Sequence, residues 1–217
     1  MREVTAKELS ELDPKRFEKE YHSWVEHHWW EGTETISDYI KNVMSPLDWD
    51  IDPKDVSWSG FWSQGDGLAF DGKMSLSAFM ERRGYKESHY ALWLDIESFG
   101  DSLIRVERGG YGRGNYFVTE AGLDDYSDND FSYGEPAGIY ENLPQEAWEE
   151  LLQLQYDEIM DEILDEAHKE AVEHARQMYK ALDADYEYST SEEQFIESCE
   201  WNEITFTVEE DEHETTN

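Results

Sequence analysis

Positive charge is scarce in this chain. Its 217 residues include 17 Lys and Arg but 53 Asp and Glu, so the formal net charge is −36. Such a chain has little to offer a nucleic-acid backbone or an anionic membrane, both of which attract cations. Because like charges repel across a compact surface and oppose folding, we expect the negative field itself to be useful. The polyanion that this field most resembles is nucleic acid.

Cysteine and long apolar runs are also nearly absent. Cys199 is the only cysteine, so no internal disulfide can form, which favours a reducing cytoplasm. The mean hydropathy is −0.84 and no long apolar run is present, which argues against a transmembrane helix. The opening residues MREVTAKELSEL have no apolar signal-peptide core. We therefore expect a protein of the cytoplasm.

Aromatic residues, by contrast, are plentiful. They make up 14% of the chain, with nine Trp, thirteen Tyr and nine Phe. Disordered acidic chains are poor in such residues, so the composition predicts a folded protein with an acidic surface. Halophilic proteins share such a surface, but here Glu is concentrated in particular segments.

Helical spacing of apolar residues marks both ends of the chain. Thr5 and Glu8 match a capping box at the start of a helical stretch over 5–31, which Pro14 divides. A long helix is predicted from Pro144 to about Leu182, and a short one after it at 190–196. One face of the long helix carries Trp148, Leu152, Ile159, Ile163, Ala167 and Ala171.

The middle of the chain alternates as strands do. Strands are predicted near 56–62, 68–70, 74–76, 89–96, 103–106 and 116–118, with a last one at 204–208. Glycine-containing turns separate them, as in an antiparallel meander. The fold class is α+β, one domain in which helices flank an antiparallel sheet. Its parts are a helical lobe (1–55), the sheet (56–120), an acidic loop (121–143), the long helix with a short helix and last strand (144–208) and an acidic tail (209–217).

Acidic residues gather in the last third of the chain. The segment from Glu141 to Asn217 holds 25 Asp or Glu against three Lys or Arg, and so carries 22 of the 36 net negative charges. The polar face of the long helix carries Glu158, Asp161, Glu162, Asp165, Glu166, Glu170 and Glu173 at steps of three and four. Such neighbours lie about 5–6 Å apart. At about 1.5 Å per residue the helix is as long as about 17 base pairs.

These seven carboxylates are the predicted partner-binding surface, with a second patch at Asp124, Asp125, Asp128 and Asp130. An ordinary solvated helix face is the alternative interpretation.

The string SWSGFWSQGDGLAF at 57–70 is the most distinctive motif. It predicts two strands joined by a turn, with a loop formed by Ser63, Gln64, Gly65, Asp66 and Gly67. One interpretation is a hairpin whose aromatic residues pack into the core. The other is a binding or metal-contacting loop that uses Gln64 and Asp66.

The remaining motifs predict no catalytic residue, metal site or cofactor. The glycine-rich stretch 109–115 lacks the Lys-Ser/Thr of a phosphate-binding loop and, with Arg105 and Arg108, forms one basic island. Asp165 and His168 have the spacing of a di-iron ligand pair, but no second pair accompanies them. Glu26-His27-His28 does not have zinc-protease spacing. We therefore expect a protein that is not an enzyme.

The SGFWSQGDG string at 59–67, completed by Phe70, resembles the SGFxSQGDGxxF motif of a family of small phage and prophage proteins. The likeness extends to ELSEL at 8–12, WWE at 29–31, DYEYSTSEE at 185–193 and WNEITF at 201–206, and so covers most of the chain. Members are often labelled antitoxins of toxin–antitoxin stability systems. The resemblance implies a phage or mobile-element protein in a bacterial cytoplasm and supplies no catalytic residues.

Together these features predict a phage-encoded, acidic, non-enzymatic inhibitor. It would mimic the charge of nucleic acid and block a basic nucleic-acid-binding host protein, such as a restriction enzyme, another anti-phage defence enzyme or a polymerase. The alternatives are an antitoxin that neutralises a basic toxin, and a metal-dependent binder or enzyme built on the SQGDG loop. The sequence is also compatible with a homodimer.

Overall fold

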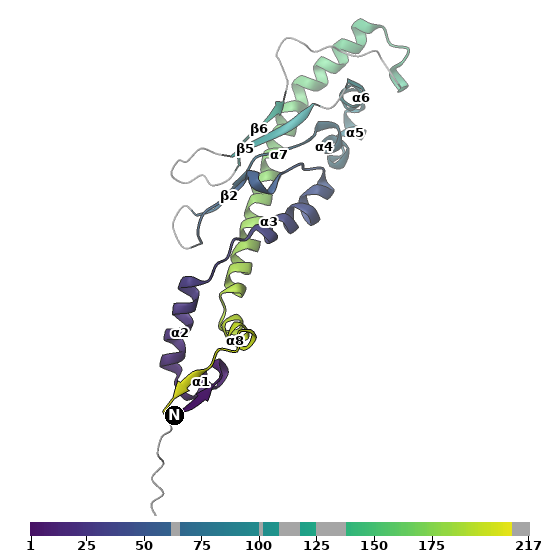
Figure 1. The fold of residues 1–217 in the computed structure, drawn as a ribbon. Helices are drawn as coiled ribbons and strands as arrows, with labels where there is room; N and C mark the ends of the chain where they lie inside the picture. Colours follow the sequence, from purple (N-terminus) through teal and green to yellow (C-terminus); the bar gives the residue numbers. More distant parts are fainter. Residues whose placement is uncertain (62–65, 100–101, 109–117, 125–137, 210–217) are drawn as a thin grey trace, which may run out of the picture. The chain divides into compact units, whose positions relative to one another are not determined.

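A computed structural model describes residues 1–61, 66–99, 102–108, 118–124 and 138–209 (Figure 1). These residues form two compact units. Unit 1 joins Met1–Gly32 to the described part of Asp183–Asn217, and unit 2 is Thr33–Leu182. The predicted helical lobe at 1–55 contains residues of both units. The first helices pack with a helix near the other end of the chain, a pairing that local patterns do not reveal.

Two helices open unit 1, and each begins as the sequence predicts. Helix α1 (Ala6–Leu12) follows Thr5, whose hydroxyl accepts a hydrogen bond from the Glu8 amide at 3.2 Å. The Glu8 carboxylate accepts one from the Thr5 amide at 2.9 Å, so the predicted capping box is confirmed. Helix α2 (Pro14–His27) starts after Asp13, which caps the Arg16 amide.

The C-terminal segment completes unit 1. Helix α8 (Glu192–Trp201) is capped by Ser191, which confirms the predicted short helix. Strand β7 (Phe206–Val208) pairs antiparallel with β1 (Arg2–Val4), with Val4 opposite Phe206. The last strand is thus shorter than the predicted 204–208.

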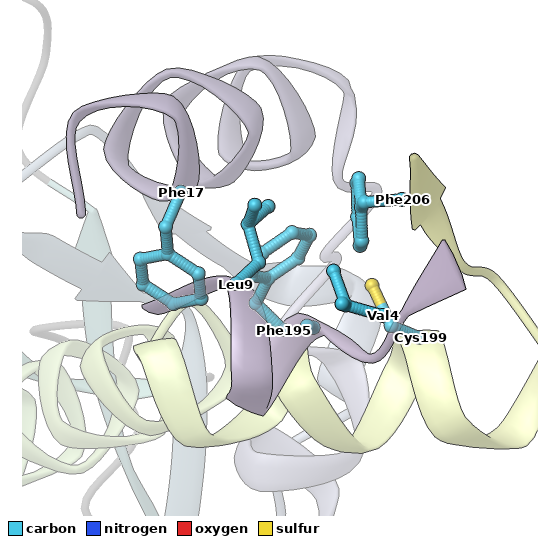
Figure 2. Packing of buried hydrophobic residues seen from close by; sticks show 7 residues of the cluster. Val4, Leu9, Phe17, Phe195, Cys199 and Phe206 are labelled. Carbon is cyan, nitrogen blue, oxygen red and sulfur yellow. The ribbon is translucent and has the colours of Figure 1, made fainter. Parts of the chain in front are cut away.

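Figure 2 shows the core of unit 1, where side chains from α1, α2, α8 and both strands meet. Tyr21 and Trp24 of α2 pack against this cluster, and their rings lie 5.9 and 5.5 Å from that of Phe195. The buried members are Val4, Ala6, Leu9, Phe17, Phe195, Cys199 and Phe206.

Two small antiparallel sheets are described in unit 2. One pairs β2 (Val56–Trp58) with β3 (Leu68–Phe70). The other has the order β4 (Gly72–Ser75), β5 (Leu103–Arg108), β6 (Val118–Asp124). The predicted meander over 56–120 is therefore divided, and helices rather than a turn connect β4 to β5.

Those connecting helices lie along the long helix α7 (Figure 1). They are α4 (Leu76–Arg83), α5 (Tyr85–Ser88) and α6 (Tyr90–Phe99). Before the sheets come α3 (Thr33–Tyr39), the π-helical turn η1 (Ile40–Met44) and the 3₁₀ turns η2 (Ser45–Leu47) and η3 (Pro53–Asp55). A further 3₁₀ turn, η4 (Gly138–Tyr140), precedes α7.

Two predicted elements are wrong. The segment 89–96, predicted as a strand, is not one, because Tyr90–Phe99 forms α6. Its Leu92 amide donates to the Gln155 side chain of α7 at 2.9 Å, so tertiary contact supports the first turn of this helix. Residues 121–124, predicted as loop, belong to β6. The rest of that loop up to residue 137 and the tail from 210 onward lie outside the described residues.

Helix α7 (Gln145–Ser189) dominates the fold, as the predicted α+β class with a long C-terminal helix requires. Its 45 residues extend past the predicted end at Leu182. The predicted apolar stripe is buried in full, from Trp148 to Ala171. Burial of one face fixes which residues of α7 face outward, and between Glu149 and Glu166 the exposed residues are mostly acidic.

Candidate functional site

The seven predicted partner-binding carboxylates of α7 have different surroundings. Glu158, Asp161, Glu162, Asp165 and Glu173 are exposed, whereas Glu166 and Glu170 are partly buried. The buried stripe on the opposite side of α7 turns the first group outward.

Glu170 lies in what we call the arginine clamp, formed with Arg82, Arg83 and Trp49. Its two carboxylate oxygens accept hydrogen bonds from Nη1 and Nη2 of Arg82, both at 2.8 Å. Arg83 donates through Nη2 at 2.6 Å, and the Trp49 indole donates at 3.1 Å. The Glu170 side chain is only 8% exposed. This carboxylate is therefore not part of the exposed acidic face.

The clamp depends on how α4 ends. Gly84 ends the helix in the left-handed conformation (φ 84°), which glycine adopts without a steric penalty. Arg82 and Arg83 thus occupy the last turn, where cations interact favourably with the helix dipole. The Phe79 ring lies beneath both guanidinium groups, at 5.2 and 5.4 Å.

Opposing effects act on the pKa of Glu170. Burial raises the pKa, but hydrogen bonds from Arg82 and Trp49 and the charges of Arg82 and Arg83 outweigh it, so the pKa lies below the ordinary 4.5. Glu170 is therefore an ionised group held in place by the fold. Its charge is balanced within unit 2.

One turn further along α7, His174 is buried beside Tyr39 of α3. The Tyr39 hydroxyl is hydrogen-bonded to His174 Nδ1 at 3.2 Å and donates to Gln177 at 3.0 Å. Burial lowers the pKa of His174, and burial with the charge of Glu173 raises the pKa of Tyr39 to about 12. Both groups are therefore neutral near pH 7, and they serve to join α3 to α7.

Glu162 and Glu166 border the clamp. Glu162 accepts a hydrogen bond from the Tyr85 hydroxyl at 3.3 Å, and Glu166 lies 3.9 Å from Arg83. Burial raises the pKa of Tyr85 to about 12, and the charges of Glu166 and Glu162 contribute to the increase. These two carboxylates are thus partly engaged inside unit 2.

We call Glu158, Asp161 and Asp165 the open stretch of α7. The first two make no hydrogen bond or ion pair with the described residues, and Asp165 pairs with Lys169 four residues later. No Lys or Arg occurs between Glu149 and Glu166, a segment with eight Asp or Glu. Beyond it the exposed cations Lys169, Arg176 and Lys180 interrupt the acidic face.

An apolar side chain lies within this acidic segment. Leu154 is 55% exposed, and Glu150 and Glu158 lie one turn before and after it on the same face. Leu154 is not among the predicted site residues, because the spacing of charges along a helix does not reveal an exposed apolar side chain between them.

The second predicted patch is described only in part. Asp124 ends β6 opposite Leu103 of β5, and Asp125, Asp128 and Asp130 lie outside the described residues.

The motif hairpin has the predicted strand pairing, with Trp58 opposite Leu68. Ser59 and Gly67 close it through two hydrogen bonds, Ser59 N to Gly67 O at 3.0 Å and Gly67 N to Ser59 Oγ at 3.2 Å. Ser63, Gln64 and Gly65 lie outside the described residues, and Asp66 is partly buried.

Aromatic side chains connect this hairpin to α7. The Phe61 ring stacks on that of Trp58 at 5.5 Å and lies 5.4 Å from that of Tyr179. The Tyr179 hydroxyl donates to the Gly60 carbonyl at 2.6 Å. These contacts favour the interpretation of the motif as a packed hairpin.

One arginine of the predicted basic island, Arg108, is held by contacts within unit 2. Arg108 donates to the Ser57 hydroxyl at 2.7 Å and pairs with Asp71 at 2.8 Å, which links β5 to the β2–β3 hairpin. The glycine-rich stretch 109–115 lies outside the described residues.

The described residues contain no candidate metal site, and their one cysteine is buried. Within them no group of His, Cys, Asp and Glu has the arrangement of a metal site, including the neighbourhood of Asp165 and His168. Cys199 is buried in unit 1, and burial together with the charge of Glu20 raises its pKa. The described helices include none with the length and apolarity needed to cross a bilayer.

The arginine clamp is not among the features predicted from the sequence. One signal pointed to it, because Arg82-Arg83 is the one pair of adjacent arginines in a chain short of cations. Comparison with known proteins adds no further assignment, since no protein-family model, curated protein or solved structure matches the chain.

Proposed function

We propose that the chain is a non-enzymatic inhibitor that presents a nucleic-acid-like charge pattern to a basic nucleic-acid-binding protein. The proposed setting is a bacterial cytoplasm and a phage gene, with a restriction enzyme, another defence enzyme or a polymerase as the target. The observation that carries the proposal is the acidic segment of α7 from Glu149 to Glu166, which no Lys or Arg interrupts. Its exposed carboxylates are Glu150, Asp157, Glu158, Asp161, Glu162 and Asp165.

The charge density of this segment supports the proposal. Eight carboxylates lie along 17 residue steps, which at about 1.5 Å each is about one negative charge per 3.2 Å of helix. One strand of B-DNA carries about one phosphate per 3.4 Å of axis. The segment therefore carries about the charge of one strand over about seven base pairs. This is shorter than the length of the whole helix, because Lys169, Arg176 and Lys180 follow it. Six of the eight carboxylates are exposed to a binding groove.

Inhibition would work by competition. The open stretch would enter a groove lined with Lys and Arg, where its carboxylates replace phosphates and steer association. Such binding weakens as salt is added, because exposed charges are screened over about 10 Å at 0.1 M ionic strength. Glu170 takes no part, because the arginine clamp balances its charge.

A charge-reversal experiment tests this function. The variant Glu158→Lys/Asp161→Lys/Asp165→Lys is compared with Glu11→Lys/Glu18→Lys/Glu26→Lys, which makes the same change in net charge at exposed carboxylates of unit 1. The readouts are DNA cleavage by purified host restriction enzymes and transcription by host RNA polymerase. We expect the α7 variant to lose inhibition by about tenfold or more and the control to retain it. Equal loss in both variants would reduce the effect to total charge and refute the proposal.

A toxin-neutralising role is the second candidate, and Leu154 is the observation that favours it. An apolar side chain 55% exposed inside an acidic segment is suited to a protein partner with an apolar pocket beside its cations. Under this alternative, Leu154→Asp would abolish rescue of cells that express the neighbouring toxic gene. A charge mimic would tolerate the same change, since it adds a further carboxylate.

A further inference from the structure

Helix α8 presents an outward face on unit 1 that the α7 proposal does not use. Phe195 and Cys199 point into the core, so Glu193, Glu197 and Glu200 face outward. Trp201 follows them and is 88% exposed, the highest value among the large apolar residues of the described chain. Tryptophan contributes about 150–250 Å² of contact area when covered, so this exposure marks a candidate contact site.

The corner after α8 holds this surface in a defined shape. Asn202 ends the helix and its side chain donates to the Ser198 carbonyl at 2.7 Å. Glu203 adopts a left-handed backbone (φ 54°), and the Ile204 amide then donates to the Cys199 carbonyl at 2.8 Å. Ile204 is 46% exposed just after the turn. Two apolar side chains are therefore exposed on one short, hydrogen-bonded corner.

The charge around the corner limits what can cover it. No Lys or Arg occurs from residue 181 to 217, whereas α8 and the corner carry Glu192, Glu193, Glu197, Glu200 and Glu203. Nucleic acid and anionic membranes are repelled by such a surface. A symmetric contact between two copies would place the same glutamates against each other, which disfavours a second copy as the occupant.

We propose that this surface docks a cationic segment of a protein partner, an amphipathic helix rich in Lys or Arg whose apolar face covers Trp201 and Ile204. The glutamates would pair with the cations at the rim, and the tryptophan would fill the apolar centre. This is a separate interaction from the one proposed for α7, on a different unit of the fold.

A defined peptide probes the surface without knowledge of the natural partner. The probe is a fluorescent Leu-Lys peptide of about fourteen residues, or about four helical turns, and its control has every Leu replaced by Ser. Binding to the full chain is followed by anisotropy. We expect Trp201→Ala to weaken probe binding about tenfold. Trp29→Ala is the matched control, because Trp29 is 81% exposed in the same unit. It should change the affinity by less than about twofold.

Matched charge variants separate this surface from α7. Glu193→Gln/Glu197→Gln/Glu200→Gln should weaken the probe, whereas Glu158→Gln/Asp161→Asn/Asp165→Asn, with the same change in net charge, should not. The two proposals can therefore fail independently. The α7 substitutions can leave inhibition unchanged while the α8 substitutions weaken probe binding, or the reverse.

Three outcomes would overturn the proposal. These are equal binding of the Leu and Ser peptides, equal effects of the two charge sets, and unchanged probe affinity of the Trp201→Ala variant. Each would mean that net charge alone attracts the peptide.

Sedimentation gives a further check on the occupant. Dissociation of a dimer caused by Trp201→Ala would identify a second copy of the chain as the occupant instead. Circular dichroism of each variant confirms that unit 1 stays folded.

Discussion

The arginine clamp and the open stretch of α7 contain the same type of residue in opposite situations. Glu170 is enclosed by Arg82, Arg83 and Trp49 and is 8% exposed. Asp161, nine residues earlier on the same helix, is exposed and has no partner among the described residues. The first charge joins α7 to α4 and to the segment before the sheets. The Asp161 carboxylate makes no such contact between elements and is available for contact with another molecule.

This difference shows that residue type alone does not define an acidic surface. The sequence pattern puts both carboxylates on the polar side of α7, and what separates them is whether cations of unit 2 face them. A chain with 17 Lys and Arg can balance only a few of its 53 acidic residues. Those left unbalanced repel one another, a cost that is consistent with a role outside folding.

The largest expected effect comes from breaking the clamp. Glu170→Gln keeps the shape of the side chain but leaves two arginines without their counter-charge. We expect a loss of about 2–3 kcal/mol in the free energy of unfolding. This is below the range of about 3–5 kcal/mol for fully buried pairs, because the Arg82 and Arg83 side chains are 28% and 38% exposed. The measurement is the midpoint of urea unfolding.

Asp161→Asn is the matched control for this comparison. It makes the same carboxylate-to-amide change on the open stretch and should shift stability by less than about 0.5 kcal/mol. Equal losses from the two variants would mean that the clamp adds no special stability.

Acid should remove the advantage of the clamp. Because the pKa of Glu170 is lowered in the folded chain, its stabilisation is complete above the ordinary value of 4.5 and disappears as the pH falls through the lowered value. The difference in unfolding free energy between the native chain and Glu170→Gln should therefore be constant near pH 7 and shrink below pH 4.5. Taking this difference cancels the protonation of the other carboxylates. A difference that grows on acidification would contradict the assignment.

The smallest effect is expected from salt on the open stretch. At low ionic strength, Glu158→Gln/Asp161→Asn should be slightly more stable than the native chain, by up to about 1 kcal/mol, because it removes like-charge neighbours on the helix and leaves the Asp165–Lys169 pair intact. Added salt screens the same repulsion, so the two chains should converge as ionic strength approaches about 1 M. Thermal unfolding at several salt concentrations measures this. A gap that does not depend on salt would rule out charge repulsion as its cause.

Local patterns predicted much of the helical structure. The Thr5–Glu8 capping box, Ser191 as the start of α8 and the buried stripe of α7 each depend on residues within a few positions of one another. The strand predicted at 89–96 is wrong because Ala91 to Leu94, followed by Ile96, form a short apolar run. A short apolar run of this kind does not distinguish a strand from a buried helix.

The candidate site was less predictable, for a related reason. The acidic face of α7 follows from helical spacing, but the withdrawal of Glu170 from it depends on arginines 87 and 88 residues away in the sequence. Likewise, nothing local indicates that Trp201 is exposed while Phe195, on the same helix, is buried. Each case is settled by packing between distant segments.

The burial of Cys199 in unit 1 has a practical consequence. It is the chain's one thiol, it lies among Val4, Leu9 and Phe206, and its raised pKa keeps it in the unreactive protonated form. A thiol reagent can therefore modify it only when unit 1 opens. The rate at which the reagent labels Cys199 therefore measures how often unit 1 opens. The measurement needs no introduced probe, and the segment Thr33–Leu182 contributes no thiol to it.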